Sequence, residues 1–339
     1  MITDYFWIDV ILKIVMVLVA MIGMALVAIY GELKVMAHMQ NRIGPYYAGG
    51  RWGWAQPLAD ALKFIQKEDL VPAGADSLIF KTAPYIVVAS TVATFVVIPF
   101  SPSLIARDLD LGVFYLLAIS SLTTLGVLMA GWSSANKYSL MGGLRAGAQL
   151  IAYELPLVLA VVAVVVQAGT MSLVGIVEAQ AAPIEIWGLS ISLPFLLKGQ
   201  IVGFVIFMVA AIAELSRIPF DMPIAESELT MGYLTEYSSL RFTMFFLGEY
   251  AAMISMSAVA ATLFLGGYWA PFVPESALIY VGPLILITKI AVLVFVMLWL
   301  RSTWPRLRED QLQDMAWRWL IPVSLANILV VAFFKVVVF

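Results

Sequence analysis

The chain contains no cysteine and only one histidine. Cysteine thiolates are the usual ligands of iron–sulfur clusters, and haem and zinc sites need more imidazole or thiolate ligands than one histidine can supply. Disulfide bonds are excluded for the same reason. We therefore expect no metal ion and no tightly bound redox centre in this chain.

Charged residues are also scarce, at 12% of the sequence, whereas hydrophobic residues make up 63%. A typical soluble domain is about half apolar and about a quarter charged. The mean hydropathy of +0.98 and the lack of any segment with soluble composition indicate an integral membrane protein, with one membrane domain over residues 1–339. The start of the chain, MITDYFWID, is acidic and does not resemble a cleavable signal peptide, so we expect the first apolar stretch to remain as a span.

Apolar stretches of about 20 residues, long enough to cross a bilayer as helices, recur along the sequence. They are too long for the strands of a membrane barrel, and backbone groups in lipid must bond within the protein. The sequence therefore predicts an all-α polytopic membrane protein, a bundle of eight transmembrane helices. The expected spans cover residues 8–30, 79–99, 111–132, 147–168, 191–213, 242–266, 279–300 and 319–338.

Basic residues gather in the loops on one side of these spans, at residues 31–78, 133–146, 214–241 and 301–318. These loops hold Lys34, Arg42, Arg51, Lys63, Lys67, Lys137, Arg145, Arg217, Arg241, Arg301, Arg306, Arg308 and Arg318. The opposite loops offer little beyond Arg107. An excess of Lys and Arg marks the cytoplasmic side. We therefore expect these loops to be cytoplasmic and both termini to lie on the outer side of a bacterial cytoplasmic (inner) membrane.

The first of these loops contains a segment with helical periodicity, WAQPLADALKFIQKE. One face of that helix would carry Trp54, Leu58, Leu62 and Ile65, and the other Asp60, Lys63 and Lys67. The pattern predicts an amphipathic helix that lies along the membrane interface. Two interpretations remain open: a plain membrane-surface helix, or the wall of a cavity whose polar row faces inward.

The segment AELSRIPFDMPIAESELTMGYLTEY, residues 213–237, concentrates acidic residues between two apolar stretches, and we call it the acidic segment. Its charged side chains are Glu214, Arg217, Asp221, Glu226, Glu228 and Glu236. Apolar residues alternate with these charges, so we expect the segment to be buried in protein rather than to form a solvated loop. Irregular backbone at membrane depth is tolerated where it lines a cavity.

Carboxylates also occur within the spans or at their ends, at Glu32, Glu154, Glu214 and Glu249. Ionisable residues in spans are costly and are by default functional candidates. Burial and neighbouring carboxylates bring carboxyl groups into a range where they exchange protons at physiological pH, as a coupled set. We interpret the four residues as parts of a hydrated polar channel; a purely structural ion-pair network is the alternative.

Four segments resemble the signature segments of a known family. They read QNRIGPYYAGGRWGWAQPLADALKFIQKED, GWSSANKYSLMGGLRAGAQLIAYELPL, ELSRIPFDMPIAESELTMGYLTEY and WLRSTWPRLREDQLQDMAWRWLIP. In this order, and between these spans, they look like the quinone-site membrane subunit of respiratory complex I, the proton-pumping NADH:quinone oxidoreductase. The resemblance extends from about Glu32 to Pro322.

The resemblance implies a subunit that has no redox centre or catalytic residue of its own. It would frame the quinone-access tunnel, dock the peripheral arm and couple quinone reduction to proton translocation. The implied proton path uses Glu154, Glu214, Asp221, Glu226, Glu228, Glu236 and Glu249. The implied quinone tunnel and peripheral-arm junction use Glu32, Arg42, Asp60, Lys63, Arg145, Arg217, Arg301 and Arg306.

The same resemblance implies which molecules this chain meets. Quinone is the substrate, while FMN and iron–sulfur clusters are expected in partner subunits. The partners would be the quinone-reducing and terminal-cluster peripheral subunits, small membrane subunits, antiporter-like subunits and membrane lipid, with no nucleic acid.

The sequence departs from the family pattern at several positions. Leu33 stands where the family usually has Arg, Ile224 replaces a Glu, Glu309 replaces a Tyr and Tyr46 replaces an Asn. These departures indicate a divergent branch of the family. They leave the electron donor open between NADH, ferredoxin and a deazaflavin, and they do not distinguish ubiquinone from menaquinone.

Two other functional classes remain as alternatives. One is the related membrane subunit of an energy-converting hydrogenase, although the RIGP and PFD segments favour the quinone-reducing branch. The other is a stand-alone secondary transporter. Transporters commonly contain inverted repeats and paired broken helices, and we find no convincing internal repeat in this sequence.

Overall fold

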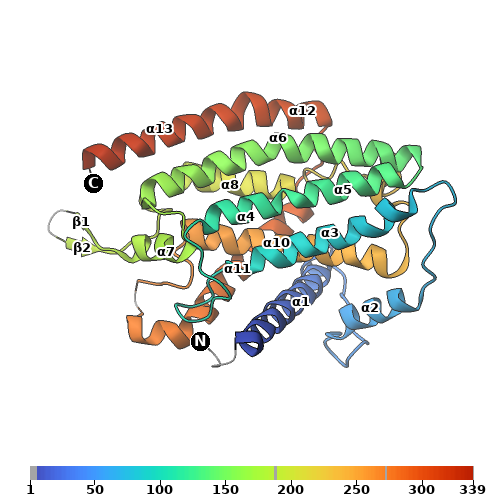
Figure 1. Cartoon of the computed structure of the whole chain (residues 1–339), viewed down its shortest axis with the longest axis horizontal. Helices are drawn as coiled ribbons and strands as arrows, with labels where there is room; N and C mark the ends of the chain where they lie inside the picture. The colour runs from blue at the N-terminus through green and yellow to red at the C-terminus, as the bar shows by residue number, and fades with distance from the viewer. Residues whose placement is uncertain (1–5, 187–188, 272, 339) are drawn as a thin grey trace.

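Long helices dominate the computed structural model, which describes residues 6–186, 189–271 and 273–338. Most of them run along one axis, while α1 (Phe6–Met39) crosses the others at an angle (Figure 1). One end of the bundle carries α7 (Leu173–Ala181) and the end of α13 (Ile321–Val338), and we refer to it as the α7 end. The opposite end carries α2 (Gln56–Gln66) and α12 (Glu309–Asp314), and we refer to it as the α12 end.

Within the described residues, 7 helical segments are long and apolar enough to cross a membrane. Besides α1, they are α3 (Ser77–Phe95), α4 with α5 (Gly112–Ser120 and Leu122–Ser133), α6 (Lys137–Ala168), α10 (Ser239–Phe264), α11 (Glu275–Thr303) and the run from α12 through the π-helix η2 (Met315–Leu320) to α13. The prediction of a helical membrane protein is thus confirmed in its class.

The predicted count of eight spans depends on residues 191–213, which do not form one continuous helix. A short hairpin, β1 (Ile184–Ile186) and β2 (Leu189–Ile191), precedes this segment, and α8 covers only Ile201–Glu214. Its 14 residues rise about 21 Å, less than the roughly 30 Å of a hydrocarbon core. Pro194 and Gly199, whose φ is 98°, lie before α8 and keep the preceding chain out of a helix.

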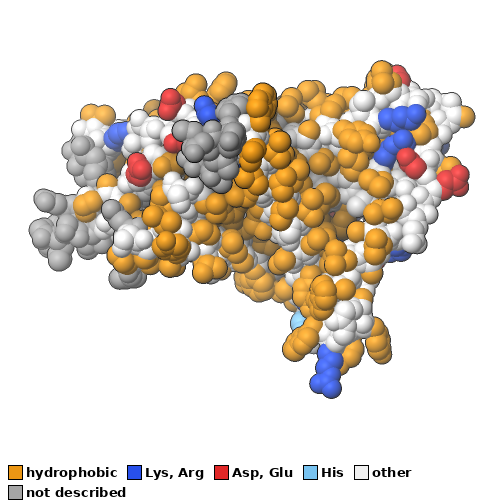
Figure 2. Space-filling model, turned by 60° about the horizontal axis from the view of Figure 1, so that its bottom comes forward, with side chains coloured by type: hydrophobic (Ala, Val, Ile, Leu, Met, Phe, Trp, Pro, Cys, Tyr) orange, Lys and Arg blue, Asp and Glu red, His pale blue; other side chains and the backbone are white. Residues whose placement is uncertain are grey.

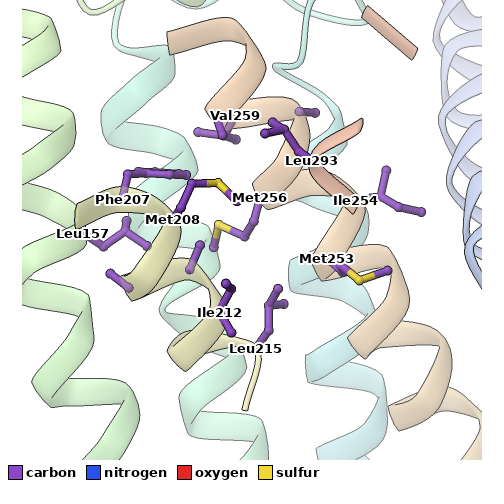
Figure 3. Close-up of a cluster of buried hydrophobic side chains, with 14 of the residues drawn as sticks. Leu157, Phe207, Met208, Ile212, Leu215, Met253, Ile254, Met256, Val259 and Leu293 are labelled. Atoms are coloured by element: carbon purple, nitrogen blue, oxygen red, sulfur yellow. The ribbon is translucent and has the colours of Figure 1, made fainter. Parts of the chain in front are cut away.

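The core of the bundle surrounds α8, which packs between α6 and α10. Phe207, Met208 and Ile212 of α8 point towards Leu157 of α6 and Met256 of α10 (Figure 3). Small residues make the close approach possible, because Ala210, Ala211 and Ala213 are each 0% exposed. α8 is therefore held by protein on several sides, which explains how a helix too short to span the bilayer can lie at the centre of the fold.

The surface follows the composition. The face in Figure 2 is apolar across its middle, and charged side chains gather towards its ends and on one projection. On α2, Leu58, Leu62 and Ile65 remain 44%, 61% and 57% exposed, so the apolar side of this helix is left uncovered by the rest of the chain. An uncovered apolar band of this kind is what a lipid bilayer or a partner subunit covers.

Two short elements connect α8 to α10. They are α9 (Glu226–Leu229) and the single turn η1 (Gly232–Leu234). The rest of the acidic segment is irregular and lies against α6 and against the residues that precede α12.

Candidate functional site

Four charged side chains from distant parts of the sequence meet near the α12 end. The buried carboxylate of Glu32 on α1 accepts a hydrogen bond from Arg217 Nη1 at 2.8 Å and another from Arg301 on α11. Arg217 Nη2 lies 3.0 Å from Glu249 Oε1 on α10. We call Glu32, Arg217, Glu249 and Arg301 the Arg217 cluster; with two arginines and two carboxylates it has no net charge.

Arg217 is the centre of this cluster and is only 3% exposed. Its guanidinium lies 4.5 Å from the ring centroid of Tyr250, within the range of a cation–π contact. Burial disfavours the charge of Arg217, but Glu249 and Glu32 outweigh it and raise the pKa above its ordinary value. The arginine therefore remains a fixed cation, and its two carboxylate partners are the groups in this cluster whose charge can change.

A cavity of about 80 Å³ lies beside the cluster, lined by α3, the end of α4, α5, α6, α10 and several residues of the acidic segment. Glu214 and Glu249 both line it. Its other polar lining residues are Thr91, Thr94, Ser120, Thr123, Ser216, Tyr233 and Ser255. The wall of the cavity is more apolar than polar, and a cavity of this volume has room for several water molecules. Glu249 is thus shared, because it faces the cavity and also pairs with Arg217.

Glu214, the last residue of α8, lines the edge of the cavity with a partly buried side chain whose Oε2 atom is fully buried. Its Oε2 has no hydrogen-bond partner among the described residues. Glu154 on α6 is near enough to repel it electrostatically. Because an unpaired buried charge is costly, water or a proton at this position would relieve that cost.

The remaining acids of the segment lie farther towards the rim of the α12 end. Asp221 Oδ2 lies 3.3 Å from Arg306 Nη2. Arg145 on α6 binds Glu228 at 2.9 Å and Glu309 of α12 at 3.4 Å, and Asn136 donates to Glu236 at 2.6 Å. The side chain of Glu226 lies outside the described residues. These contacts tie the acidic segment to α6 and α12.

Besides Arg145 and Arg306, three further residues of the predicted tunnel and junction lie apart from the Arg217 cluster. Asp60 and Lys63 form an exposed pair with each other on α2, with a distance of 2.9 Å. Arg42 donates to Gln40 at 2.7 Å at the exposed end of α1. The chain by itself therefore brings Glu32, Arg217 and Arg301 together, but not the polar row of α2.

Ile224, one of the departures from the family pattern, lies in the wall of the cavity. It is partly buried and packs with the apolar cluster around Phe80 and Tyr237. The cavity wall is therefore apolar at a position where the family pattern has an acid.

Residues that sequence reasoning missed hold the acidic segment in place. Gln149 Nε2 donates to the backbone oxygens of Ala213 and Phe220, at 2.7 and 2.8 Å. Tyr153 donates to the backbone oxygen of Leu312 at 2.9 Å, which fixes α12 to α6. A glutamine inside an apolar run was the available signal for the first contact; no sequence signal identified the second.

The backbone of the acidic segment and of the residues that follow it is also unusual. Ser216, Thr230, Met231 and Ser239 have φ values of 50°, 48°, 78° and 53°, in the left-handed region that non-glycine residues seldom adopt. Such residues cost free energy and persist where surrounding contacts hold them. The contacts from Gln149 supply part of that restraint.

Charged residues at the α7 end behave differently. Lys289 Nζ donates to the backbone oxygens of Leu265, Gly267 and Trp269, each at 2.7 Å, where α10 ends. Lysines elsewhere at this end do the same, since Lys335 donates to Val166 O of α6 and Lys198 donates to the backbone oxygens of Gln180 and Ala182 at the end of α7. Lys289, which lies within the seventh predicted span, thus caps the end of α10. Among the described residues, no group of His, Cys, Asp or Glu is arranged to hold a metal ion.

Comparison with known proteins adds an independent finding. Residues 12–332 match a family described as NADH dehydrogenase. Among similar proteins, the H subunit of NADH-quinone oxidoreductase from Bacillus mycoides (strain KBAB4) is 44% identical over 326 residues, which cover 95% of this chain and 92% of the relative. The proteins of the same name from Bacillus cereus (strain B4264) and Bacillus thuringiensis subsp. konkukian (strain 97-27) are 43% and 44% identical over the same length.

Proposed function

Because this chain belongs to the NADH dehydrogenase family, we propose that it is a membrane subunit of a quinone-reducing, proton-translocating complex. Its role is to frame the access path and reduction chamber of quinone and to couple quinone reduction to proton movement. It holds no redox centre of its own; FMN and iron–sulfur clusters belong to partner subunits. Its partners are the peripheral, small membrane and antiporter-like subunits of that complex.

The proposal includes a placement in the bacterial inner membrane. α8 acts as the eighth crossing, shortened and supported by α6 and α10, so that both termini lie on the outer side. The α12 end, with loops 31–78, 133–146, 214–241 and 301–318, then faces the cytoplasm. This placement is supported by the basic residues of those loops.

Quinone approaches through the space framed by α1, α2 and α10, three helices that lie against one another. The uncovered apolar side of α2 suits an isoprenoid tail, and Asp60 with Lys63 supplies a polar wall. Arg42 and the pair of Arg145 with Glu228 lie on exposed surface at the α12 end, where the peripheral subunits would dock. Arg306 with Asp221 supports the same junction.

The proposed coupling role rests on one observation about Glu249. Its carboxylate pairs with Arg217, and the same residue lines the cavity. Reduction of quinone consumes protons and changes the charge near Glu32 and Arg301. That change alters how strongly Arg217 holds Glu249 and therefore how strongly Glu249 and Glu214 bind protons. Glu154 of α6 belongs to the same proton path as Glu249 and Glu214. The path continues with the acidic segment residues Asp221, Glu226, Glu228 and Glu236, and these carboxylates act as one coupled set.

Glu214 offers the direct test because one of its oxygens has no hydrogen-bond partner among the described residues. Glu214→Gln keeps the shape of the side chain and removes the site that binds a proton. We expect about a hundredfold loss of proton pumping, the lower end of what a lost proton-transfer group costs. Pumping and quinone reductase activity are measured in membrane vesicles, per assembled complex on a native gel.

Glu178→Gln is the matched control, since Glu178 is an exposed carboxylate on α7 at the opposite end. It should leave both activities unchanged. The proposed proton role of Glu214 fails if Glu214→Gln pumps at the wild-type rate with normal assembly.

A further inference from the structure

The cavity that Glu214 and Glu249 line has a second set of polar residues, which come from the long helices rather than from the acidic segment. Each of them carries a hydroxyl group: two lie on α3, one at the end of α4, one on α5 and one on α10. Four of the five are at most 7% exposed, so bulk solvent does not reach them. We call this set the hydroxyl wall; its members are Thr91, Thr94, Ser120, Thr123 and Ser255.

The hydroxyl wall extends the cavity from the carboxylates towards the middle of the bundle. α10 runs from the α12 end to the α7 end (Figure 1). Because Ser255 follows Glu249 by six positions on this helix, it lies about 9 Å nearer to the α7 end. α3 approaches α10 closely at Gly248, where an added Cβ would lie 3.9 Å from Thr91 Oγ1. The wall therefore begins beside the turn that carries Glu249 and continues away from the acidic segment.

Every hydroxyl of the wall donates its hydrogen to the backbone oxygen three or four positions earlier in the chain. Serine and threonine within helices can do so because this carbonyl lies within their reach. A hydroxyl group has one donor and two lone pairs, so a hydroxyl bound in this way offers only acceptor sites to the cavity. The bonds run from Thr91 to Val87 O (2.7 Å), from Thr94 to Thr91 O (2.7 Å), from Ser120 to Leu117 O (3.0 Å), from Thr123 to Ser120 O (2.6 Å) and from Ser255 to Ala252 O (2.9 Å).

Acceptors therefore predominate in the polar lining of the cavity. Ionised carboxylates also only accept hydrogen bonds, and Glu214 Oε2 has no partner among the described residues. Ser216 and Tyr233 are the other hydroxyl-bearing residues of the lining, and two donors there still leave acceptors in excess. Water in this cavity must donate to its surroundings, and a hydronium ion, which offers only donors, fits better than neutral water. The donors and acceptors that line a pore decide which ions it admits.

We propose that the hydroxyl wall holds an excess proton on the water of this cavity, beyond the carboxylates themselves. A protonated Glu214 or Glu249 gives its proton to a cavity water and becomes a carboxylate, and the water becomes a hydronium ion. The reverse transfer restores both groups, so no other reactant is consumed. The hydroxyls accept hydrogen bonds from the hydronium ion and thereby stabilise it towards the middle of the bundle. This inference rests on the proton-coupling role proposed above.

The test is Thr91→Val in the intact complex, because valine keeps the shape of threonine and replaces the hydroxyl by a methyl group. Loss of one hydrogen bond to an ion should weaken proton binding in the cavity about tenfold. We expect proton pumping per assembled complex to fall about tenfold on the alkaline side of its pH profile, and the midpoint there to move about one pH unit lower. Thr91→Ser, which keeps the hydroxyl, should pump at nearly the wild-type rate.

Thr82→Val is the matched control on the same helix. Thr82 donates to Leu78 O at 3.0 Å, as the wall residues donate to their own backbone, but it is not among the described residues that line the cavity. Ser255→Ala repeats the test on α10, with Ser257→Ala as its control, since Ser257 donates to Met253 O at 2.8 Å and lies outside that lining. Both controls should keep the wild-type pumping rate and pH profile.

The outcomes separate this inference from the proposed function. If Glu214→Gln loses pumping while Thr91→Val and Ser255→Ala keep the wild-type rate and pH profile, the hydroxyl wall is overturned and the coupling role stands. If Thr91→Ser pumps no faster than Thr91→Val, or Thr82→Val shifts the profile as far, the loss comes from packing and the inference is again overturned. If Glu214→Gln and Thr91→Val both pump normally, the proposed function and this inference fail together.

Discussion

The two ends of the bundle use buried charge in different ways. At the α12 end, Arg217 binds the carboxylates of Glu32 and Glu249, and both partners are ionisable side chains. At the α7 end, Lys289 binds three backbone carbonyls at the end of α10. A carboxylate can take up a proton and release its partner, whereas a backbone carbonyl cannot titrate. The ion pairs of Arg217 can therefore change with protonation, whereas the hydrogen bonds of Lys289 hold the end of α10 in one state.

The lysines of the α7 end fit the physical needs of helix termini. The last carbonyls of a helix have no partner within the helix, and the negative end of its dipole attracts a cation. Lys289, Lys198 and Lys335 come from three different parts of the chain and meet three such termini. The comparison teaches that a charged residue inside a span is not by itself a sign of transport; the partner atoms decide.

The largest expected effect follows from removal of Arg217. Arg217→Met leaves Glu32 and Glu249 without their shared cation, and breaking a buried pair in this way costs about 3–5 kcal/mol. We expect a marked fall in the melting temperature of the assembled complex and loss of quinone reductase activity. Arg241→Met is the control, since Arg241 pairs with the half-exposed Asp69 at 3.0 Å and should cost less. Equal melting temperatures for Arg217→Met and wild type would contradict the central role of this arginine.

A smaller effect is expected for Lys289→Met. Carbonyls left without a hydrogen bond cost about 1–3 kcal/mol, so the melting temperature should fall. Pumping per assembled complex should remain at the wild-type level, because the lysine binds backbone and belongs to no proton path. Lys335→Met, which removes a bond of 2.6 Å to Val166 O, should behave in the same way. A pumping defect in either variant, measured at a temperature where the complex is intact, would break the contrast between the two ends.

The smallest effect is expected at the exposed pair of Arg308 with Asp310. Their side chains are 2.6 Å apart but 76% and 63% exposed. Solvent and salt screen such pairs, so Arg308→Ala should leave the melting temperature unchanged. A clear drop in the melting temperature of the isolated chain would show that charge pairs at the α12 end stabilise it even where they are exposed.

The sequence alone predicted the class of the fold because hydropathy acts locally. A run of apolar residues such as the one from Ser239 to Phe264 must be helical in lipid, whatever surrounds it. The same local reasoning did not predict where the helix within residues 191–213 begins. An apolar average concealed Pro194 and Gly199, and the helix that formed is short.

Residue types also indicated where the chemistry lies, without showing how its parts connect. The absence of cysteine, the acidic segment and the carboxylates in the spans all followed from the sequence, and the four signature segments pointed to the family. The sequence did not show which carboxylate pairs with which arginine. Glu32 and Arg217 are 185 positions apart, and their contact depends on which faces of α1 and the acidic segment meet.

Tertiary structure therefore decided the features on which the proposed mechanism depends. It placed Glu249 between Arg217 and the cavity, made Lys289 a helix cap and put Thr91 and Ser255 in the cavity wall. The physical reason is that burial of apolar surface is set along each segment by its own composition, whereas ion pairing and hydrogen bonding require two groups within about 3 Å in a defined orientation. That condition is met only when separate helices pack.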